Sequence, residues 1–287
     1  MIPNLEILKP KSIKKVLEIL DSNRDNAKIL AGGTDIIPAF HIKSQRLRKV
    51  KLLIDVNDIQ ELKVIKKNDE SVIVGSCLTF SEIIQNKYLN KKYPLLVKAA
   101  KCIGSNQIRN RATIGGNFIN NAPCADSVPP LLVYNARLKI VSPAGEREIL
   151  LENFLKSPYK TKLKTNELVV KIILPKINKD YKGDFNKLGR RRGVAISRIT
   201  LAGLAKINNS KIIDLRLASG AVTPMGIRFH GIEKRYINKR IEPEFYAEIS
   251  REVGRNILEV TGIRYSTPYK VPVTQQLCYQ LLNKILS

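Results

Sequence analysis

The chain opens with a helical pattern and then changes to short, continuous apolar runs. Apolar residues recur at helical spacing over residues 12–20, and Ser12 stands where an N-cap is expected. The runs at 28–30 and 52–56 are typical of buried strands, and a glycine-rich turn and a helical segment separate them. We therefore predict a small α/β unit over residues 1–57.

A second unit follows with a different order of elements. The sequence predicts a strand over 71–75, a capped helix that starts at Thr79 and a further helix over 93–101. Residues 105–141 are rich in Gly, Asn and Pro, and we interpret them as a long functional loop, because loops of that length are uncommon inside compact domains. Alternating strands end near Pro175, so the second unit is expected to span residues 58–176.

The remaining residues, 177–287, predict a third, α+β unit. The polar segment 178–184 is expected to be a linker. The sequence predicts strands over 198–207 and 212–218 and a glycine-rich turn at 219–220. Two helices are expected to follow, one beginning at Glu244 and one at Thr274.

The charge of the chain is unusual, whereas its overall composition is ordinary. Its 287 residues are 44% apolar and 26% charged, which excludes wholesale disorder. The formal net charge is +25, and a strongly positive net charge is common among nucleic-acid-binding proteins. Here, however, the basic residues are dispersed, and the densest run is the short segment 189–193. An acidic protein partner, a phosphate-bearing cofactor or simple solubility explains the charge equally well.

Cysteine spacing and hydropathy exclude several other classes. Cys77, Cys102, Cys124 and Cys278 are widely spaced, so we expect free thiols in a reducing cytoplasm and no metal site in this chain. The N-terminal residues lack the apolar core of a signal peptide. No window approaches the length of a membrane span, so we expect a cytoplasmic chain without one.

Two glycine elements carry the candidate chemistry. Ala31–Asp35 follows a strand, and its adjacent glycines allow positive φ and convergence of backbone N–H groups on a diphosphate ahead of a helix. Its spacing differs from the dinucleotide-binding Gly-x-Gly-x-x-Gly pattern. Thr113–Asn117 is a second such element, with Asn121 and Asp126 beyond it. Two ordinary turns are the structural alternative to a ligand clamped between two domains.

The sequence has no recognisable set of catalytic side chains. His41 and His230 lie near no serine or cysteine nucleophile motif, and His41 is expected on a helix surface. Cys124 lies in the predicted loop without an adjacent base. We therefore assign no catalytic residue, and the pattern indicates a chain that holds a cofactor.

Longer segments carry a family resemblance over nearly the whole chain. AGGTDIIPAF and QIRNRATIGGNFINNAPCADSVPPLLVYNARL resemble the flavin-binding medium subunits of the xanthine dehydrogenase and carbon monoxide dehydrogenase family. LLIDVNDIQEL, IVGSCLTFSEI, FNKLGRRRGVAIS and TGIRYSTPYKVPVTQQLCYQLL resemble further parts of that family. The cysteine-rich insertion of some members is missing. Cys124 and Pro268 also depart from the pattern, which leaves open the role of the Arg264, Ser266 and Tyr269 element.

The resemblance implies a fold and a set of FAD-binding residues. The fold is α+β, with a two-part FAD-binding domain of the vanillyl-alcohol-oxidase type followed by a C-terminal α+β domain. FAD is expected between the first two units, with its ring toward the third. The implied cofactor-binding residues are Ile29, Leu30, Ala31, Gly32, Gly33, Thr34, Asp35, Ile36, Thr113, Ile114, Gly115, Gly116, Asn117, Asp126, Val169 and Lys187.

The resemblance also implies partner chains and a direction of electron flow. A large subunit carries the molybdenum cofactor and oxidises the substrate, and a small subunit carries iron–sulfur clusters, in a heterotrimer or a dimer of heterotrimers. The present chain takes electrons from a cluster onto FAD and passes them to an external acceptor. The basic, Trp-free composition suggests a thermophilic archaeal source, and among the family's substrates an aldehyde such as glyceraldehyde is expected.

Two alternatives remain at this point. One is a basic adaptor for nucleic acid or protein that holds no cofactor. The other is a stand-alone flavin oxidase, which would need its own substrate pocket and base.

Overall fold

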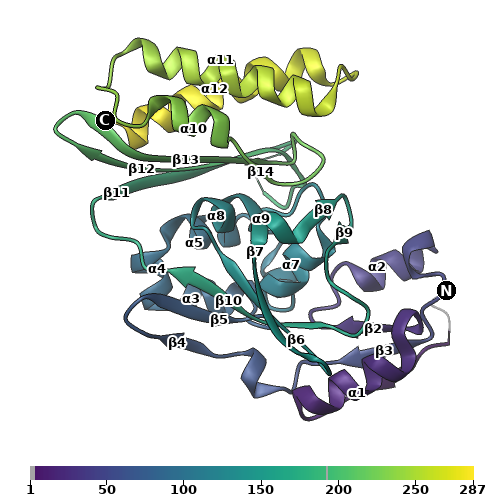
Figure 1. The fold of residues 1–287 in the computed structure, drawn as a ribbon. Coiled ribbons are helices and arrows are strands. Elements are labelled where there is room, and N and C mark those ends of the chain that lie inside the picture. The colour runs from purple at the N-terminus through teal and green to yellow at the C-terminus, as the bar shows by residue number, and fades with distance from the viewer. Residues whose placement is uncertain (1–3, 192) are drawn as a thin grey trace.

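The computed structural model describes residues 4–191 and 193–287, which form three main sheets with helices packed on them (Figure 1). Residues 1–3 and residue 192 lie outside the described residues. The first belong to the segment predicted to lack the apolar core of a signal peptide, and the second to the arginine run. The mixture of helices and sheets confirms the expected α+β class.

The N-terminal sheet is parallel, in the order β1-β3-β2. Helix α1 begins after Ser12, whose side chain accepts a hydrogen bond from the Lys15 N–H and so confirms the predicted N-cap. The helix buries Val16 and Leu20. The elements of this unit are β1 (Glu6–Leu8), α1 (Ile13–Asn23), β2 (Ala27–Leu30), α2 (Ile36–His41) and β3 (Leu52–Asp55), with short 3-10 helices at Arg24–Asn26, Gln45–Leu47 and Gln60–Leu62.

The second sheet is antiparallel, in the order β4-β5-β10-β6-β7. Thr79 caps the helix that follows β5, as predicted, and the structure adds a complete capping box with Glu82. The strands are β4 (Ile65–Lys67), β5 (Ser71–Gly75), β6 (Arg137–Ser142), β7 (Gly145–Leu150) and β10 (Leu168–Pro175), with the hairpin β8 (Leu155–Ser157) and β9 (Lys160–Thr161). The helices are α3 (Phe80–Gln85), α4 (Lys87–Lys92), α5 (Pro94–Lys101), α6 (Asn106–Arg109), α7 (Ile114–Asn120), α8 (Val128–Val133) and α9 (Leu151–Phe154).

The prediction of one long loop over 105–141 was wrong. The segment contains helices α6, α7 and α8 and most of strand β6. Prolines and glycines suggested a loop, but Pro129 and Pro130 lie in the first turn of α8, where a missing N–H leaves no hydrogen bond unmade. Each helix is short, and burial stabilises α7 and α8. All six residues of α8 are buried.

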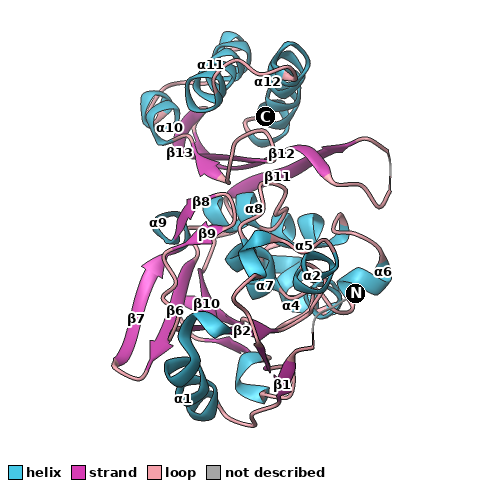
Figure 2. Ribbon diagram, turned by 90° about the vertical axis from the view of Figure 1, so that its right-hand side faces the viewer, coloured by secondary structure: helices cyan, strands magenta, loops and turns pink. Residues whose placement is uncertain are grey.

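The C-terminal sheet has the order β11-β12-β13-β14. Its helices α10, α11 and α12 cover one face, and the other face packs against α5 and α8 of the preceding unit (Figures 1 and 2). The elements are β11 (Tyr181–Gly189), β12 (Ser197–Asn208), β13 (Lys211–Gly220), β14 (Ile227–Arg228), α10 (His230–Tyr236), α11 (Glu244–Thr261) and α12 (Thr267–Ile285).

Three predicted boundaries in this unit were wrong. The expected linker 178–184 already contains the start of β11, an edge strand in which most residues are partly exposed and can be polar, while Phe185 is buried. Gly220 ends β13 instead of forming a turn, because it pairs with Thr200 of β12, and a Cβ there would lie 2.7 Å from Thr200 Oγ1. Helix α12 begins at Thr267, ahead of Thr274, with Pro272 inside it.

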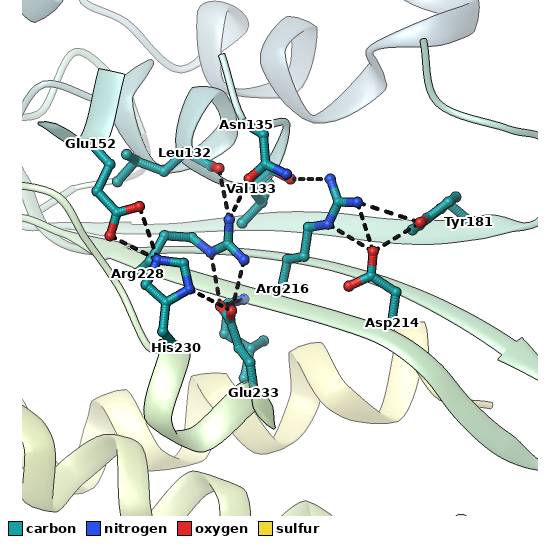
Figure 3. Close-up of polar contacts among 11 residues, drawn as sticks. Leu132, Val133, Asn135, Glu152, Tyr181, Asp214, Arg216, Arg228, His230 and Glu233 are labelled. Carbon is teal, nitrogen blue, oxygen red and sulfur yellow. Dashed lines mark hydrogen bonds and ion pairs between the residues drawn. The ribbon is translucent and has the colours of Figure 1, made fainter. Parts of the chain in front are cut away.

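A polar seam joins the C-terminal domain to the end of α8 (Figure 3). Arg228 donates to the Leu132 carbonyl at 3.2 Å and to Asn135 Oδ1 at 2.7 Å, and Arg216 donates to the Val133 carbonyl at 3.2 Å. Arg216 thus satisfies the Val133 carbonyl, whereas the Leu132 carbonyl also accepts from the Asn135 N–H at 2.9 Å. Arg228 is itself paired with Glu233 at 2.7 Å, and both side chains are buried.

Replacement of Arg228 by Met should therefore destabilise the protein, because the Glu233 carboxylate would stay buried without its cation. We expect the free energy of unfolding to fall by about 3 kcal/mol. Arg240→Met, on an exposed arginine, should change it by less than about 0.5 kcal/mol. Urea denaturation followed by circular dichroism measures both, and equal midpoints for the two variants would refute the role of the seam.

Candidate functional site

The first glycine element forms a tight turn between β2 and α2, as predicted. Gly33 has φ +75°, which favours glycine. The Ala31 carbonyl accepts a hydrogen bond from Asn57 Nδ2 at 2.7 Å, and the same amide donates to Asp55 Oδ1 at 2.7 Å. The turn that follows β3 therefore holds the glycine turn from one side. Sequence reasoning did not assign a role to Asp55 or Asn57, although both lie in the LLIDVNDIQEL segment.

Backbone N–H groups of this turn are free to bind a ligand. In the part of the chain that the structure describes, the N–H groups of residues 32–36 donate no hydrogen bond. The first N–H of this region to donate is that of Ile37, to the Gly33 carbonyl at 3.1 Å. Successive free N–H groups on a turn form a concave anion-binding surface. The predicted diphosphate site has the donors that such a ligand needs.

The second glycine element lies at the start of α7, and its N–H groups are already used. Ile114 donates to the Leu78 carbonyl, Gly115 to the Ser76 carbonyl, Gly116 to Thr113 Oγ1 and Asn117 to the Thr113 carbonyl, all within 3.1 Å. The second element can therefore contact a ligand through its side chains and through close approach of its backbone. The first element, in contrast, has free backbone N–H donors.

The first glycine element contacts the backbone just ahead of the second one. A Cβ on Gly32 would lie 2.1 Å from the Arg111 carbonyl oxygen and 2.9 Å from Ala112 Cα, just ahead of Thr113. A Cβ on Gly115 would lie 2.6 Å from the Ser76 carbonyl oxygen. Both positions therefore require glycine for lack of space, and the structure brings together the two elements that the sequence singled out.

Arg46 places a positive charge beside the first turn. Its guanidinium lies 3.6 Å from the Asp35 carboxylate and donates to Asn120 Oδ1, at the end of α7, at 2.9 Å. It also lies 4.0 Å above the Tyr159 ring. Sequence reasoning missed Arg46, because nothing in its local pattern distinguishes it from the other basic residues.

Asp126 and Lys187, predicted separately, form one buried ion pair. Lys187 Nζ lies 2.7 Å from Asp126 Oδ2 and also donates to the Cys102 carbonyl at 2.7 Å. The Ser197 hydroxyl donates to Asp126 Oδ1. Burial raises the pKa of the Asp126 carboxyl, and the Lys187 ammonium and the Ser197 hydroxyl oppose that rise. The pair links the second unit to strands β11 and β12.

Three other predicted cofactor-binding residues, Ile29, Leu30 and Val169, lie in the strands next to the glycine elements. Ile29 and Leu30 form the end of β2. Val169 is buried in β10, and the carbonyl of the adjacent Val170 accepts from the Ser76 N–H at 3.1 Å. The strand that carries Val169 is therefore bonded to Ser76, whose carbonyl accepts from Gly115. Whether its side chain contacts FAD stays a prediction.

The candidate catalytic side chains are scattered. His41 lies on the exposed surface of α2, as predicted, and His230 pairs with Glu152 in the interdomain seam. Within the described ranges the four cysteines are free thiols, and burial raises the pKa of Cys77 to about 11. No three His, Cys, Asp or Glu side chains of residues 4–191 and 193–287 are grouped as metal ligands.

Two hollows in the surface lie away from the glycine elements. One, of about 330 Å³, lies beside α10 and α11, and the other, of about 390 Å³, lies beside α3 and α6. Of the helices in the described residues, none is long and apolar enough to cross a membrane.

Known families match both parts of the chain. Residues 3–177 match the FAD binding domain in molybdopterin dehydrogenase, and residues 185–285 match the CO dehydrogenase flavoprotein C-terminal domain. The chain therefore belongs to the family of FAD-binding medium subunits of xanthine and carbon monoxide dehydrogenases, which are oxidoreductase subunits.

Individual relatives span the whole chain. The xanthine dehydrogenase FAD-binding subunit of Escherichia coli O157:H7 is 31% identical over 93% of this chain and 91% of its own length. The glyceraldehyde dehydrogenase medium chain of Sulfolobus acidocaldarius is 29% identical over 99% of each chain. A solved carbon monoxide dehydrogenase structure from Hydrogenophaga pseudoflava superposes with a TM-score of 0.92 at 25% identity, covering 99% of this chain and 98% of its own.

The geometry of the first turn fits FAD, the cofactor of this family. Free N–H groups at residues 32–36 suit a diphosphate, and the cation of Arg46 lies beside them.

Replacement of Gly33 by Val should weaken FAD binding, because a β-branched residue disfavours a φ of +75° and its bulk enters the turn. We expect at least about a tenfold loss of affinity, which equals about 1.4 kcal/mol. Flavin absorbance per mole of purified chain measures the loss. Gly231→Ala is the matched control, because a Cβ there meets nothing within 4 Å. Normal flavin content in the Gly33 variant would remove this turn from the site.

Proposed function

We propose that this chain is the FAD-binding electron-transfer subunit of a heteromeric molybdenum hydroxylase. It receives electrons from the iron–sulfur clusters of a partner chain and passes them to an external acceptor. The observation that carries the proposal is the run of free N–H groups at residues 32–36, on a turn that packs against the second glycine element of a flavin-binding family.

Each part of the site has a role in holding the cofactor. The N–H groups of the first turn bind the diphosphate, and Arg46 adds positive charge beside it. The glycines of Thr113–Asn117 let the start of α7 approach the cofactor closely. Ile29, Leu30 and Val169 pack around the site. Asp126 and Lys187 form its polar end, toward the C-terminal domain. When bound, FAD supplies the redox chemistry that connects one-electron clusters with the acceptor.

The proposal includes two partner chains and a substrate class. Relatives named as medium chains of glyceraldehyde and carbon monoxide dehydrogenases support a large molybdenum-cofactor subunit and a small iron–sulfur subunit, in a heterotrimer or its dimer. The full-length match to the Sulfolobus acidocaldarius chain favours an aldehyde such as glyceraldehyde as the substrate of the molybdenum subunit. We also propose a cytoplasmic location and the units 1–57, 58–176 and 177–287.

The basic adaptor without a cofactor is less well supported. The charge that suggested it is present in a chain whose two parts both match flavoprotein domains. The free N–H groups of the first turn have no role in that alternative.

Division of labour among the subunits provides the first test. The isolated chain should bind FAD and should not oxidise aldehydes or purines. In the assembled complex, removal of FAD should stop transfer to the flavin-dependent acceptor and leave reduction of the clusters by substrate intact. Bleaching of cluster absorbance after substrate addition measures this. Clusters that stay oxidised without FAD would reverse the proposed electron path.

Replacement of Asp126 by Asn provides the second test. The change leaves the Lys187 ammonium buried without its counter-ion, so the polar end of the site should rearrange. We expect about tenfold weaker FAD binding and a loss of about 3 kcal/mol of stability. Asp180→Asn, at an exposed ion pair with Lys206, is the control and should bind FAD normally. Unchanged FAD affinity in the Asp126 variant would place the flavin away from this pair.

A further inference from the structure

Two contacts join the N-terminal unit to the second unit on either side of the free N–H groups at residues 32–36. At the start of these residues, the Gly32 backbone lies against the Arg111–Ala112 peptide and leaves no room for a side chain. Near their end, the Asp35 carboxylate lies 3.6 Å from the Arg46 guanidinium, which also contacts the second unit. The first contact consists of main chain, whereas the second consists of side chains and can open by rotation about their bonds.

Arg46 makes two contacts with the second unit. It donates a hydrogen bond to Asn120 Oδ1, at the end of α7, at 2.9 Å. Its guanidinium also lies 4.0 Å above the ring of Tyr159, in the turn between β8 and β9. A planar guanidinium can donate hydrogen bonds in its plane and stack on an aromatic ring with its face, a combination that an ammonium group lacks. Arg46 therefore connects the first turn with α7 and with the β8–β9 hairpin.

The Tyr159 ring is held in place by a strained backbone. Tyr159 has φ +60°, a left-handed conformation that bulky residues rarely adopt. Its N–H donates to the Asn121 carbonyl at 2.9 Å, and the buried Asn121 side chain donates to the Ser157 and Lys160 carbonyls at 2.8 and 3.0 Å. Strained residues of this kind are found at ligand clamps. Glycine or asparagine would adopt this conformation more readily, so the tyrosine indicates a use for the ring itself.

The contacts of Arg46 contribute little to the stability of the fold. The Arg46 and Asp35 side chains are 36% and 52% exposed, and Tyr159 is 44% exposed. Solvent screens ion pairs at such positions, and cation–π contacts there are weak as well. A strained backbone combined with weak, partly exposed contacts is therefore better explained by a role toward a ligand than by a role in folding.

We propose that Arg46 and Tyr159 form a clasp over the diphosphate end of the flavin site, and that opening of this clasp limits the rates at which FAD enters and leaves the chain. The main-chain contact at Gly32 keeps the other side closed, so the cofactor passes on the Arg46 side. The contacts of the clasp lie within the chain, so they hold back entry and release alike and leave the affinity unchanged. The inference rests on the proposed function, because it takes FAD as the ligand of the first turn.

The rates of FAD binding and release by the full chain test the clasp, with flavin fluorescence recorded after rapid mixing and after dilution. Tyr159→Asn keeps a residue that tolerates the left-handed backbone and removes the ring. Arg46→Lys keeps the charge and removes the planar guanidinium. In both variants association and dissociation should become about fivefold faster, with an unchanged Kd, as expected for the loss of one cation–π contact or hydrogen bond. Tyr159→Phe keeps the ring and should exchange FAD at the unaltered rates.

A double variant and a control show whether the two residues act together. Arg46→Lys combined with Tyr159→Asn should exchange FAD about as fast as the faster single variant, because both changes open the same contact. Arg48→Lys, on an exposed arginine of the same segment, is the control and should leave both rates unchanged. Rate increases that multiply in the double variant would mean that Arg46 and Tyr159 act separately, and would overturn the clasp.

Flavin content and the thermal unfolding midpoint, measured on every variant, separate the two proposals. A chain that binds no FAD overturns the proposed function and the clasp together. If the chain binds FAD and the Tyr159→Asn and Arg46→Lys variants exchange it at the unaltered rates, the clasp alone is overturned. Faster release with an unchanged association rate would make these residues direct contacts of FAD, and would also overturn the clasp.

Discussion

The backbone contact between Gly32 and the Arg111–Ala112 peptide is the constraint on which the site depends. It admits no side chain, since a Cβ at Gly32 would lie 2.1 Å from the Arg111 carbonyl oxygen. The parallel N-terminal sheet and the second unit therefore meet at main chain, beside the free N–H groups of the first turn. Backbone donors held in this way need no reorganisation when an anion binds, which favours a rigid cofactor site.

Buried ion pairs then fix the third domain relative to that site. Lys187 on β11 reaches Asp126 just before α8, and at the other end of α8 Arg228 on β14 reaches the Leu132 carbonyl and Arg216 on β13 reaches the Val133 carbonyl. Helix α8 is thus tied to the C-terminal domain at both ends. Such pairs add little net stability, because desolvation opposes their attraction, but breaking one leaves a charge buried. Their effect is to select one arrangement of the domains.

The distribution of charge explains why the net charge alone was ambiguous. The buried cations at the two ends of α8, Lys187 and Arg228, are matched by the carboxylates of Asp126 and Glu233. In the C-terminal domain, by contrast, Arg198, Arg264 and Lys270 form no ion pair with any described carboxylate. A total of +25 cannot distinguish a phosphate site from a protein interface, whereas the position of the unpaired cations can.

Local chemistry determined much of this protein from the sequence alone. The helix caps at Ser12 and Thr79 and both glycine elements depend on neighbouring residues, and the structure has them where the sequence predicted them. Family motifs extended that prediction to the cofactor. Tertiary structure decided the rest: burial made helices of the Pro- and Gly-rich segment 105–141, and pairing with β12 made a strand of residues expected to form a linker. Arg46 and the Asp126–Lys187 pair act through contacts between residues far apart in the chain, which no local pattern encodes.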